Sequence, residues 1–565
     1  MTREELQTII AFVEKGRGFS TQHLGITEPL WDIVLFVMRR HLENKLVTMT
    51  SLAQSSNFPY TTAVRKIDHM IEEGLIIKRA RTVTGKSFSL HPSEELIARF
   101  HQYAFDMKEL VAMTFGFPVD DEGRSNYYFG ASYLAASIIP APTVLRQGIG
   151  IDNTLRVLVN DDQTFLVWQR VIGDLEQWLG GHVDITMVNL DQLRERTLEN
   201  ANEELSNYDI VDFDLPWLGE YHQRNVLRPI DDLVARGDFN VSDFQPTGWE
   251  ASSYEDVQYG VPIEPTPELL FYRRDILEGA DIELPETTDD LLRALSELNK
   301  KCPDIRGISF CAAPGAPIAH MFMQIMGDFG RPPINLPLVN GDFDLSQIQG
   351  EQLRPCIDTP EGLAAADYLL RLKAFAPDDI LEMDWDKTVR RFSDGDVAFA
   401  YAWSGRASRF DLNPGSPAYR NTGYMAHPNG ANGPNISPMG GYALGIPANI
   451  APDRVDLAWR VIKYLTSPAV TKFYMQKGCL VSPRFSVNAD PEVRNMSRII
   501  ETVDNLAQQG RLKFWQRPPV PEFSDIVRVL GGEIHDMMRG NTSPANALSR
   551  AQSHIDQLMR AHNHY

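Results

Sequence analysis

Apolar residues recur along this chain with two different spacings, and the spacing changes near residue 150. Over 1–115 they repeat at helical spacing, which predicts a helix over 29–46 and two shorter helices on either side of the Asn57-Phe58-Pro59 turn. Gly74 ends the last of these helices. Alternating residues over 75–90 then predict a β-hairpin.

After residue 154, short buried runs alternate with amphipathic helices. Leu155–Val159, Val183–Val188 and Tyr208–Asp212 have the apolar centres of strands, and helical patterns separate them. This alternation predicts a parallel sheet. The segment between the two patterns is rich in Gly, Pro, Tyr and Ser and predicts a connection. We therefore expect an α+β domain at 1–115, a linker at 116–150 and an α/β region at 151–565.

The helices and hairpin of the first domain place cations on one surface. The run LAQSSNFPYTTAVRKIDHMIEEGLI resembles the winged helix-turn-helix of MarR-type bacterial regulators, and the resemblance covers about 29–115. It implies that the second helix of the motif enters the major groove of operator DNA while the wing meets the backbone. The residues expected to contact DNA are Tyr60, Thr61, Thr62, Arg65, Lys66, Arg79, Arg81 and Lys86. Alternatively, these cations are a solvated face of a module that binds protein.

The charge and the cysteine content of the chain limit the kinds of partner and cofactor that it can have. The chain has a net charge of −21, of which residues 1–115 contribute +1, so only the first domain suits a polyanion. The four cysteines show neither CxxC nor zinc-ligand spacing, so no metal, cofactor or disulfide is expected. The start MTREELQTII lacks the basic segment of an export signal, and no run approaches the ~20 apolar residues that span a bilayer. These features predict a cytoplasmic chain with no membrane partner.

The stretch YDIVDFDLPWLGEY, residues 208–221, carries the first candidate chemistry. Its strand ends at Asp212 and Asp214, close to Trp217, and ligands of open α/β sheets bind at the carboxyl ends of strands. Carboxylate oxygens accept hydroxyl protons, and an indole face covers the C–H surface of a sugar ring. The stretch therefore fits a carbohydrate site, and it fits equally well an ordinary strand–loop junction with a core tryptophan.

Further motifs follow this stretch in a fixed order. They include YGVPIEPTPELLFYRRDIL (259–277), FSDGDVAFAYAWSGRA (392–407), SPMGGYALGIPANI (437–450) and GCLVSPRFSV (478–487). Together they resemble the family 1 extracellular solute-binding proteins, the maltose-binding-like receptors of sugar importers, over about 155–559. The resemblance implies a two-lobed periplasmic-binding-protein fold, class II-like, with a hinge and a ligand cleft between the lobes. The residues expected to bind the ligand are Asp161, Asp212, Asp214, Trp217, Glu264, Thr266, Trp403, Arg406, Gly441, Tyr442 and Arg484.

The two resemblances together predict a carbohydrate-responsive transcription regulator. A sugar bound between the lobes would control operator binding by the N-terminal domain, and a palindromic operator would call for a homodimer. One alternative is the solute-binding receptor of a sugar ABC transporter, which the missing export signal disfavours. A second is a carbohydrate-active enzyme using Asp212, Asp214 and Glu264, but these acids show no acid/base spacing, so a non-enzyme is expected.

Overall fold

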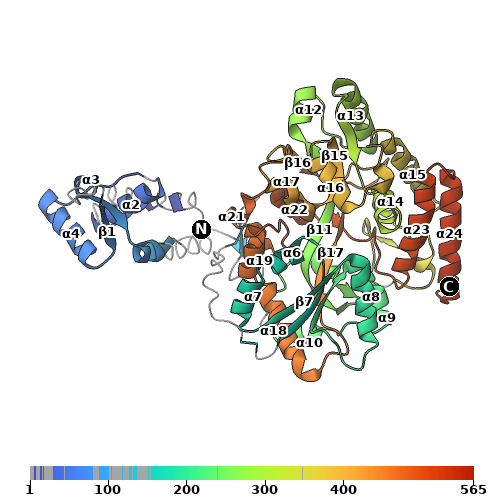
Figure 1. Ribbon diagram of the computed structural model, residues 1–565, viewed down its shortest axis with the longest axis horizontal. Coiled ribbons are helices and arrows are strands. Elements are labelled where there is room, and N and C mark those ends of the chain that lie inside the picture. The colour runs from blue at the N-terminus through green and yellow to red at the C-terminus, as the bar shows by residue number, and fades with distance from the viewer. Residues whose placement is uncertain are drawn as a thin grey trace. The chain divides into compact units, whose positions relative to one another are not determined.

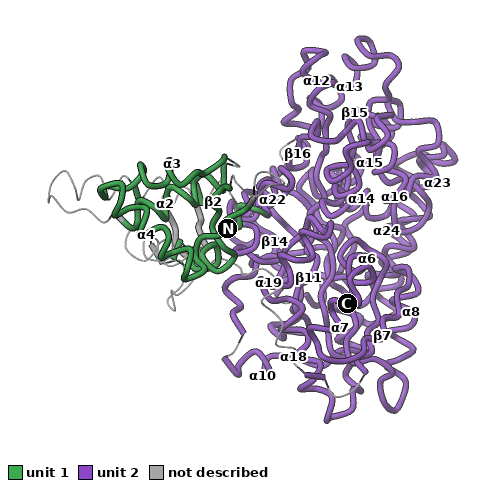
Figure 2. Tube along the Cα trace, turned by 60° about the vertical axis from the view of Figure 1, so that its left-hand side comes forward, with its two compact units in different colours: residues 1–138, 489–492 green, residues 139–488, 493–565 purple. Residues whose placement is uncertain are grey.

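The computed structural model describes residues 29–43, 45–80, 88–100, 103–104, 150–151, 154–237, 239–346, 348–431 and 433–565, with short stretches at 6–7, 10, 13–14, 17, 117–118, 126–129 and 132–135. The chain forms two compact units, one of residues 1–138 with 489–492 and one of residues 139–488 with 493–565 (Figure 2). Within the described ranges, no helix combines the length and the apolar character needed to cross a bilayer.

Among the described residues from 29 to 92, the first unit has three helices followed by two antiparallel strands. The strands pair with Lys78 opposite Leu90. A three-stranded antiparallel sheet, in the order β3-β4-β5, lies within the segment that the sequence indicated as a linker. The elements are α2 (Pro29–Leu42), α3 (Met49–Gln54), α4 (Tyr60–Glu72), β1 (Ile76–Ala80), β2 (Phe88–Pro92), β3 (Phe117–Pro118), β4 (Asn126–Phe129) and β5 (Ser132–Ala135).

Local signals explain where these helices begin and end. The hydroxyl of Thr48 accepts a hydrogen bond from the Ser51 N–H and so caps the N-terminus of α3. Gly74 has φ of 75°, a left-handed conformation that suits glycine and ends α4. Ile33, Ile67 and other apolar side chains of α2, α4 and the hairpin are buried in one core.

The proposed DNA contacts of the first unit occupy α4 and β1. Tyr60, Thr61 and Arg65 are exposed on α4, Thr62 and Lys66 are half-buried there, and Arg79 is exposed on β1. Arg81, Lys86 and the predicted hairpin tip lie outside the described residues.

The second unit is built on one nine-stranded sheet with the strand order β12-β15-β11-β17-β8-β6-β7. β16 pairs with β11, and β18 pairs with β17. β6 runs parallel to β7 and β8, as the strand–helix alternation predicted, and β12 runs parallel to β15. The strands are β6 (Leu155–Asn160), β7 (Val183–Val188), β8 (Ile210–Asp214), β11 (Gly260–Arg273), β12 (Arg306–Ser309), β15 (Val397–Trp403), β16 (Thr422–Met425), β17 (Ser437–Gly445) and β18 (Leu512–Lys513).

The long strand β11 connects two halves of this sheet. Its first half, Gly260–Pro267, pairs with β17, whereas its second half, from Glu268, pairs with β15 and β16. Figure 1 shows α12, α13 and β15 on one side of β11 and β17, with α7, α10 and β7 on the other. The second unit therefore has two lobes joined through β11.

Helices cover both lobes, and short strand pairs and 3-10 turns complete them. Between α6 and α13 the helices are α6 (Gln163–Arg170), α7 (Ile172–Leu179), α8 (Leu190–Ala201), α9 (Leu218–Gln223), α10 (Asp231–Val234), α11 (Pro246–Glu250), α12 (Arg274–Ala280) and α13 (Thr288–Lys301). The later helices are α14 (Ala316–Asp328), α15 (Pro360–Lys373), α16 (Trp385–Ser393), α17 (Ser408–Asp411), α18 (Val455–Leu465), α19 (Pro468–Gln476), α20 (Phe485–Asn488), α21 (Pro491–Arg494), α22 (Arg498–Gln508), α23 (Phe523–Met538) and α24 (Pro544–Ala561). The minor elements are β9 (Ser253–Tyr254), β10 (Val257–Gln258), β13 (Leu338–Val339), β14 (Asp342–Phe343), η2 (Leu215–Trp217), η3 (Gly350–Leu353), η4 (Ile380–Glu382), η5 (Ser404–Ala407) and η6 (Pro452–Arg454).

Apolar clusters stabilise the second unit. One surrounds β6, α6 and α18 and includes Val157 and Trp459. Another extends from β6, where it includes Leu158, to α14 and α23, where it includes Phe322 and Ile534. Because this second cluster contains residues of both lobes, apolar packing as well as β11 joins the lobes.

Candidate ligand-binding site

Strand register lines up the candidate side chains across the middle of the sheet. Tyr442 on β17 lies opposite Asp214 on β8 and opposite Glu264 on β11. Further along β11, Glu268 lies opposite Trp403 at the end of β15. Cross-strand partners point to the same face, so the register brings together residues that are far apart in the sequence. We call this group the strand-junction cluster.

The ends of β6 and β8 extend the strand-junction cluster. The backbone N–H and side-chain amide of Asn160 donate to Asp212, at 3.1 and 2.6 Å, and both residues are buried. Asp162 caps the N-terminus of α6 through a hydrogen bond from the Gln163 N–H. The same carboxylate accepts from Arg406 at 3.2 Å. Asp162, on one lobe, therefore pairs with an arginine of the other lobe.

Glu264 lies at the centre of the strand-junction cluster. Its side chain is buried and accepts a hydrogen bond from the Thr164 N–H, at 2.9 Å, in the first turn of α6. A Cβ on Gly405 would lie 3.2 Å from the Glu264 carboxylate. Gly441 has φ of 106°, and a Cβ there would lie 1.8 Å from the Glu264 carbonyl oxygen. The Gly440-Gly441 motif is therefore required for β17 to approach β11 this closely.

Arg517 completes the cluster from a segment far along the chain. Its guanidinium donates to Asp214 at 3.1 and 3.4 Å and lies 5.0 Å from the ring centroid of Trp403. Both members of the Arg517–Asp214 pair are buried. A buried ion pair is stable only when its hydrogen bonds are well placed, and here Arg517 also contacts the aromatic face.

A second buried group adjoins the cluster at Glu268. His427 Nδ1 lies 2.9 Å from Asp328, and His427 Nε2 lies 4.0 Å from Glu268. The His427 ring packs edge-on against Tyr401, with 4.7 Å between the ring centroids. Burial lowers the pKa of His427, but the charge of Asp328 and its hydrogen bond outweigh burial, so the net pKa is raised.

Burial controls the acidity of the carboxyl groups. It raises the pKa of Asp212 well above the usual range, with the N–H of Asn160 opposing the shift. It also raises the pKa of Glu264, and the charge of Asp162 adds to that increase. Burial raises the pKa of Glu268 to about 7. These carboxyl groups therefore hold protons more readily than exposed acids do, and a protonated carboxyl can donate as well as accept.

The arrangement suits a neutral ligand with many hydroxyl groups. Carboxyl and arginine side chains offer acceptors and donors, Tyr442 adds a hydroxyl, and Trp403 is half-buried with an aromatic face. The charges within the strand-junction cluster are largely paired with each other, as in Asp214–Arg517 and Asp162–Arg406. A ligand of high net charge would disturb this balance, whereas a polyol or sugar would not.

Some candidates named from the sequence lie in other surroundings. Trp217 is buried, and its ring packs 5.9 Å from that of Tyr221 in the apolar core. Arg484 is buried in a separate pair, where it donates to Asp243 at 3.0 Å and stacks on Phe244. The remaining candidates that the structure places are Asp161, which is exposed beside Asp162, and Thr266, which is buried opposite Gly440 on β17.

Sequence reasoning missed several members of the site. Asn160 ends β6 and Asp162 lies just before α6, so their position between a strand and a helix was a usable signal. Arg517 precedes two prolines, which fix the backbone next to a cation, but no motif pointed to it. Glu268 lies on the same strand as Glu264 and Thr266 but was not singled out with them, and His427 lies after β16 with no surrounding pattern.

Comparison with known proteins shows what the second unit is similar to. The family profile of the bacterial extracellular solute-binding proteins matches residues 166–472. The structure is similar to that of an ABC transporter solute-binding protein from Agrobacterium radiobacter K84 in complex with ribitol, with 23% identity and a TM-score of 0.65 over 72% of this chain and 99% of that one. It is also similar to maltose-bound MalE3 of T. maritima, with 19% identity and a TM-score of 0.61 over 72% and 99% of the two chains. A third similar structure is a solute-binding protein from Agrobacterium vitis S4 with D-mannitol, with 20% identity and a TM-score of 0.61 over the same shares.

These comparisons correct the function predicted from the sequence. The two-lobed periplasmic-binding-protein fold is confirmed, but the expected transcription regulator is wrong, because the matches are solute-binding proteins of transporters. The expected cytoplasmic location is wrong for the same reason, and the expectations of operator DNA and a homodimer lose the support that the regulator gave them. The family match covers more than half of the 565 residues. The chain belongs to the bacterial extracellular solute-binding protein family.

Proposed function

We propose that this chain is the solute receptor of an ABC importer, acting outside the cytoplasm, and that it binds a polyol or small sugar at the strand-junction cluster. The observation that carries the proposal is the register of β8, β17, β11 and β15. It sets Asp214, Tyr442 and Glu264 in one row across β8, β17 and β11, and it sets Glu268, further along β11, opposite the half-buried Trp403. Hydroxyl acceptors beside an aromatic face are what a sugar or polyol requires.

The proteins with similar structures support this ligand class. They were solved with ribitol, maltose and D-mannitol, which are all neutral and rich in hydroxyl groups. The strand-junction cluster suits such ligands, because arginines pair with Asp162 and Asp214 and burial favours the neutral form of the remaining carboxyl groups. The lobes meet at β11, so a bound ligand would contact both lobes and favour the conformation in which they are close.

The pairing of the acids supports binding rather than catalysis. Asp212 accepts from Asn160, Asp214 is held by Arg517, and Glu264 accepts from the start of α6. A glycoside hydrolase needs one carboxyl group free to protonate the leaving oxygen and a second to act as base or nucleophile. We therefore propose that the chain is not an enzyme.

We further propose that residues 29–92 fold as a winged-helix module. The order α2, α3, α4, β1 and β2, with an antiparallel pairing of the two strands, supports this fold. The order of elements by itself supports no particular partner.

The proposed ligand class is tested by measuring the melting temperature of the full chain, and ligand binding by calorimetry, with ribitol, D-mannitol and maltose. A ligand at a hundredfold excess over Kd should stabilise the protein by about 2.7 kcal/mol. Asp214→Asn should reduce or abolish the shift, because it removes a charged acceptor and releases Arg517. The matched control is Asp243→Asn, which breaks the equally buried Asp243–Arg484 pair. It should lower the melting temperature and leave the ligand-induced shift intact.

Two outcomes would refute this proposal. One is that none of the three compounds, nor any member of a wider polyol and sugar panel, raises the melting temperature. The other is that Asp243→Asn abolishes ligand binding while Asp214→Asn does not.

A further inference from the structure

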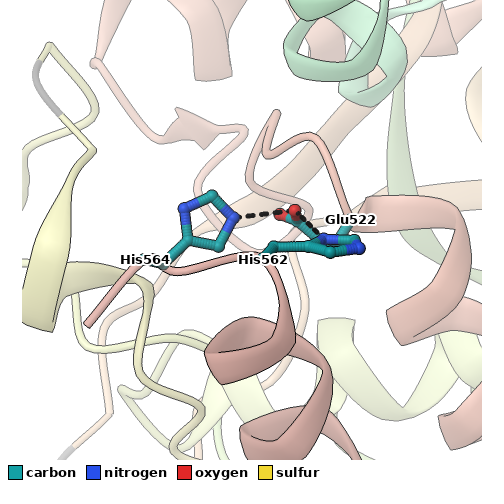
Figure 3. A group of neighbouring side chains, drawn as sticks. All are labelled: Glu522, His562 and His564. Atoms are coloured by element: carbon teal, nitrogen blue, oxygen red, sulfur yellow. Dashed lines mark hydrogen bonds and ion pairs between the residues drawn. The ribbon is translucent and has the colours of Figure 1, made fainter.

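Two histidines near residue 565 converge on one buried carboxylate. His562 Nδ1 lies 2.6 Å from Glu522 Oε1, and His564 Nε2 lies 2.7 Å from the same oxygen. Figure 3 shows both rings turned toward the Glu522 carboxylate. One ligand atom from each of the three residues lies within 4.8 Å of the other two. This group is separate from the strand-junction cluster and does not depend on the function proposed for it.

The backbone at the end of α24 fixes the two rings on the same side. The N–H of Asn563 donates to the carbonyl of Arg560, and the N–H of His564 donates to that of Met559. With Asn563 at φ of 58°, these bonds form a Schellman motif. His562 and His564 occupy the positions on either side of the left-handed residue, so the turn itself sets their spacing.

Contacts beyond the turn hold it against the rest of the second unit. The hydroxyl of Tyr565 donates to Asp556 at 3.0 Å, and the guanidinium of Arg354 lies 4.3 Å from the Tyr565 ring centroid. Arg354 also donates to Asp556 at 3.2 Å. The histidine pair is therefore presented by an anchored segment.

Glu522 is an incompletely satisfied acceptor. It precedes α23, its side chain is 2% exposed, and its Oε2 has no hydrogen-bond partner among the residues that the structure describes. Its other oxygen faces both rings. Leaving a buried carboxylate oxygen without a partner is costly, and groups left in this state call for an explanation. A bound cation would neutralise the charge and satisfy the carboxylate.

We propose that Glu522, His562 and His564 form a binding site for a transition-metal ion, with Zn²⁺ as the ion that fits best. Two imidazole nitrogens and one carboxylate are a common ligand set of zinc, whereas Mg²⁺ and Ca²⁺ prefer oxygen ligands. Zn²⁺ holds nitrogen and oxygen ligands at about 2.0–2.2 Å in tetrahedral geometry, so neighbouring ligand atoms are about 3.3 Å apart. The two histidine nitrogens therefore need to move less than about 1 Å from their present positions next to Oε1.

Metal binding would replace the hydrogen bonds that join the rings to Glu522. The proton on the nitrogen that now faces Glu522 would leave that nitrogen, either by shifting to the other nitrogen of a neutral ring or by passing to solvent from a doubly protonated ring. The nitrogen that it leaves would then give its lone pair to the metal. The His562 side chain is 46% exposed and that of His564 is 17% exposed, which gives the ion a route from solvent. A water molecule or an external ligand would fill the fourth position.

The test uses the full chain stripped of metal with a chelator and titrated with ZnCl₂ in a calorimeter. We expect one Zn²⁺ per chain. The double variant His562→Gln/His564→Gln should lose at least about 100-fold in affinity, because a lone carboxylate binds Zn²⁺ weakly. With Co²⁺ in place of Zn²⁺, the visible absorption of a four-coordinate nitrogen–oxygen site should appear at one equivalent and be absent from the double variant.

A matched control is His182→Gln. His182 also pairs with a single carboxylate, that of Glu176, but the His182 side chain is 71% exposed and this ion pair includes no second histidine. This variant should bind Zn²⁺ as the wild type does. Glu522→Gln provides a second test that changes no histidine, and it should also weaken binding. Circular dichroism of each metal-free variant checks that it is folded.

The proposal is overturned if the double variant binds Zn²⁺ as tightly as the wild type. It is also overturned if His182→Gln reduces Zn²⁺ binding as much as the double variant does. A third contradicting outcome is that the wild type binds no stoichiometric Zn²⁺ at ~100 μM, because a site with a Kd of about 1 μM would be nearly saturated at that concentration.

Discussion

Two tryptophans that look alike in the sequence lie in different surroundings. Trp217 lies just after β8 and Trp403 is the last residue of β15, and each was proposed to contact a sugar. Trp403 is half-buried at the end of β15, with Arg517 over its ring, whereas Trp217 is 6% exposed and packs on Tyr221. The first has the surroundings of a binding residue, and the second has those of a core residue.

Alanine substitution should separate these roles. Trp217→Ala should lower the free energy of unfolding by about 3–5 kcal/mol without ligand, because it leaves a cavity in a packed core. Trp403→Ala should cost clearly less stability but remove most of the ligand-induced shift, because it deletes the aromatic face. Chemical denaturation and ligand titration of both variants measure the two effects. The opposite pattern, with a large apo loss for Trp403→Ala and an unchanged ligand shift, would place Trp403 in the core.

Glu268 makes the free energy of unfolding depend on pH, and the sign of this dependence follows from the burial of the Glu268 side chain. Its pKa is raised from 4.5 to about 7 in the folded protein. Between these values the unfolded chain has released the proton and the folded chain retains it, so stability falls as pH rises from about 4.5 to 7. The raised pKa of His427 acts in the same direction, because stability from its protonated form is lost as pH rises above 6.5.

We therefore predict that Glu268→Gln flattens the pH profile of stability. The wild type should lose up to about 3 kcal/mol between pH 4.5 and 7 from this group, at about 1.4 kcal/mol per unit of pKa shift. The variant should lack that portion of the decrease, since Gln does not titrate. Denaturant unfolding at a series of pH values measures the difference between the two proteins. A difference that stays constant across this range would show that Glu268 titrates normally.

Single elements were the part of the structure that the sequence predicted best. The apolar runs of β6, β7 and β8 identified strands, and the acids at the end of β8, Asp212 and Asp214, lie in the strand-junction cluster. This works because alternation and strand ends are local properties of the chain. The helix α4 begins at Tyr60, directly after the predicted turn, because Pro59 permits a helix to start but cannot extend one backwards.

Contacts between elements could not be predicted in the same way. Arg517 pairs with Asp214 across 303 positions of sequence, and it reaches Asp214 because β18, which precedes it, and β8 both pair with β17. Trp217 and Trp403 had the same local pattern, so their difference in burial comes from tertiary packing. The regulator prediction failed for a related reason: a helix–turn–helix pattern describes a local fold, and a fold alone does not determine the partner.

At the scale of the whole molecule, each of the two units buries its own apolar core. In the first unit Ile33, Ile67 and Leu90 are buried together, and the apolar clusters of the second unit consist of that unit's own residues. Every residue of the strand-junction cluster belongs to the second unit. Ligand binding should therefore be a property of residues 139–565, and the stability of the first unit should be independent of the ligand.

Calorimetry of the full chain tests this independence. We expect two unfolding transitions, of which a polyol or sugar ligand moves only the larger, because the ligand stabilises the unit that binds it by RT ln(1 + [L]/Kd), about 2.7 kcal/mol at a hundredfold excess. A chain that begins at residue 139 should show the larger transition alone and bind the same ligand with an unchanged Kd. The two units would be energetically coupled if the ligand moved both transitions together, or if the shortened chain bound the ligand at least tenfold more weakly. Each factor of ten in Kd would correspond to a coupling free energy of about 1.4 kcal/mol. The first unit would then contribute to solute binding, a role that the independent cores do not predict.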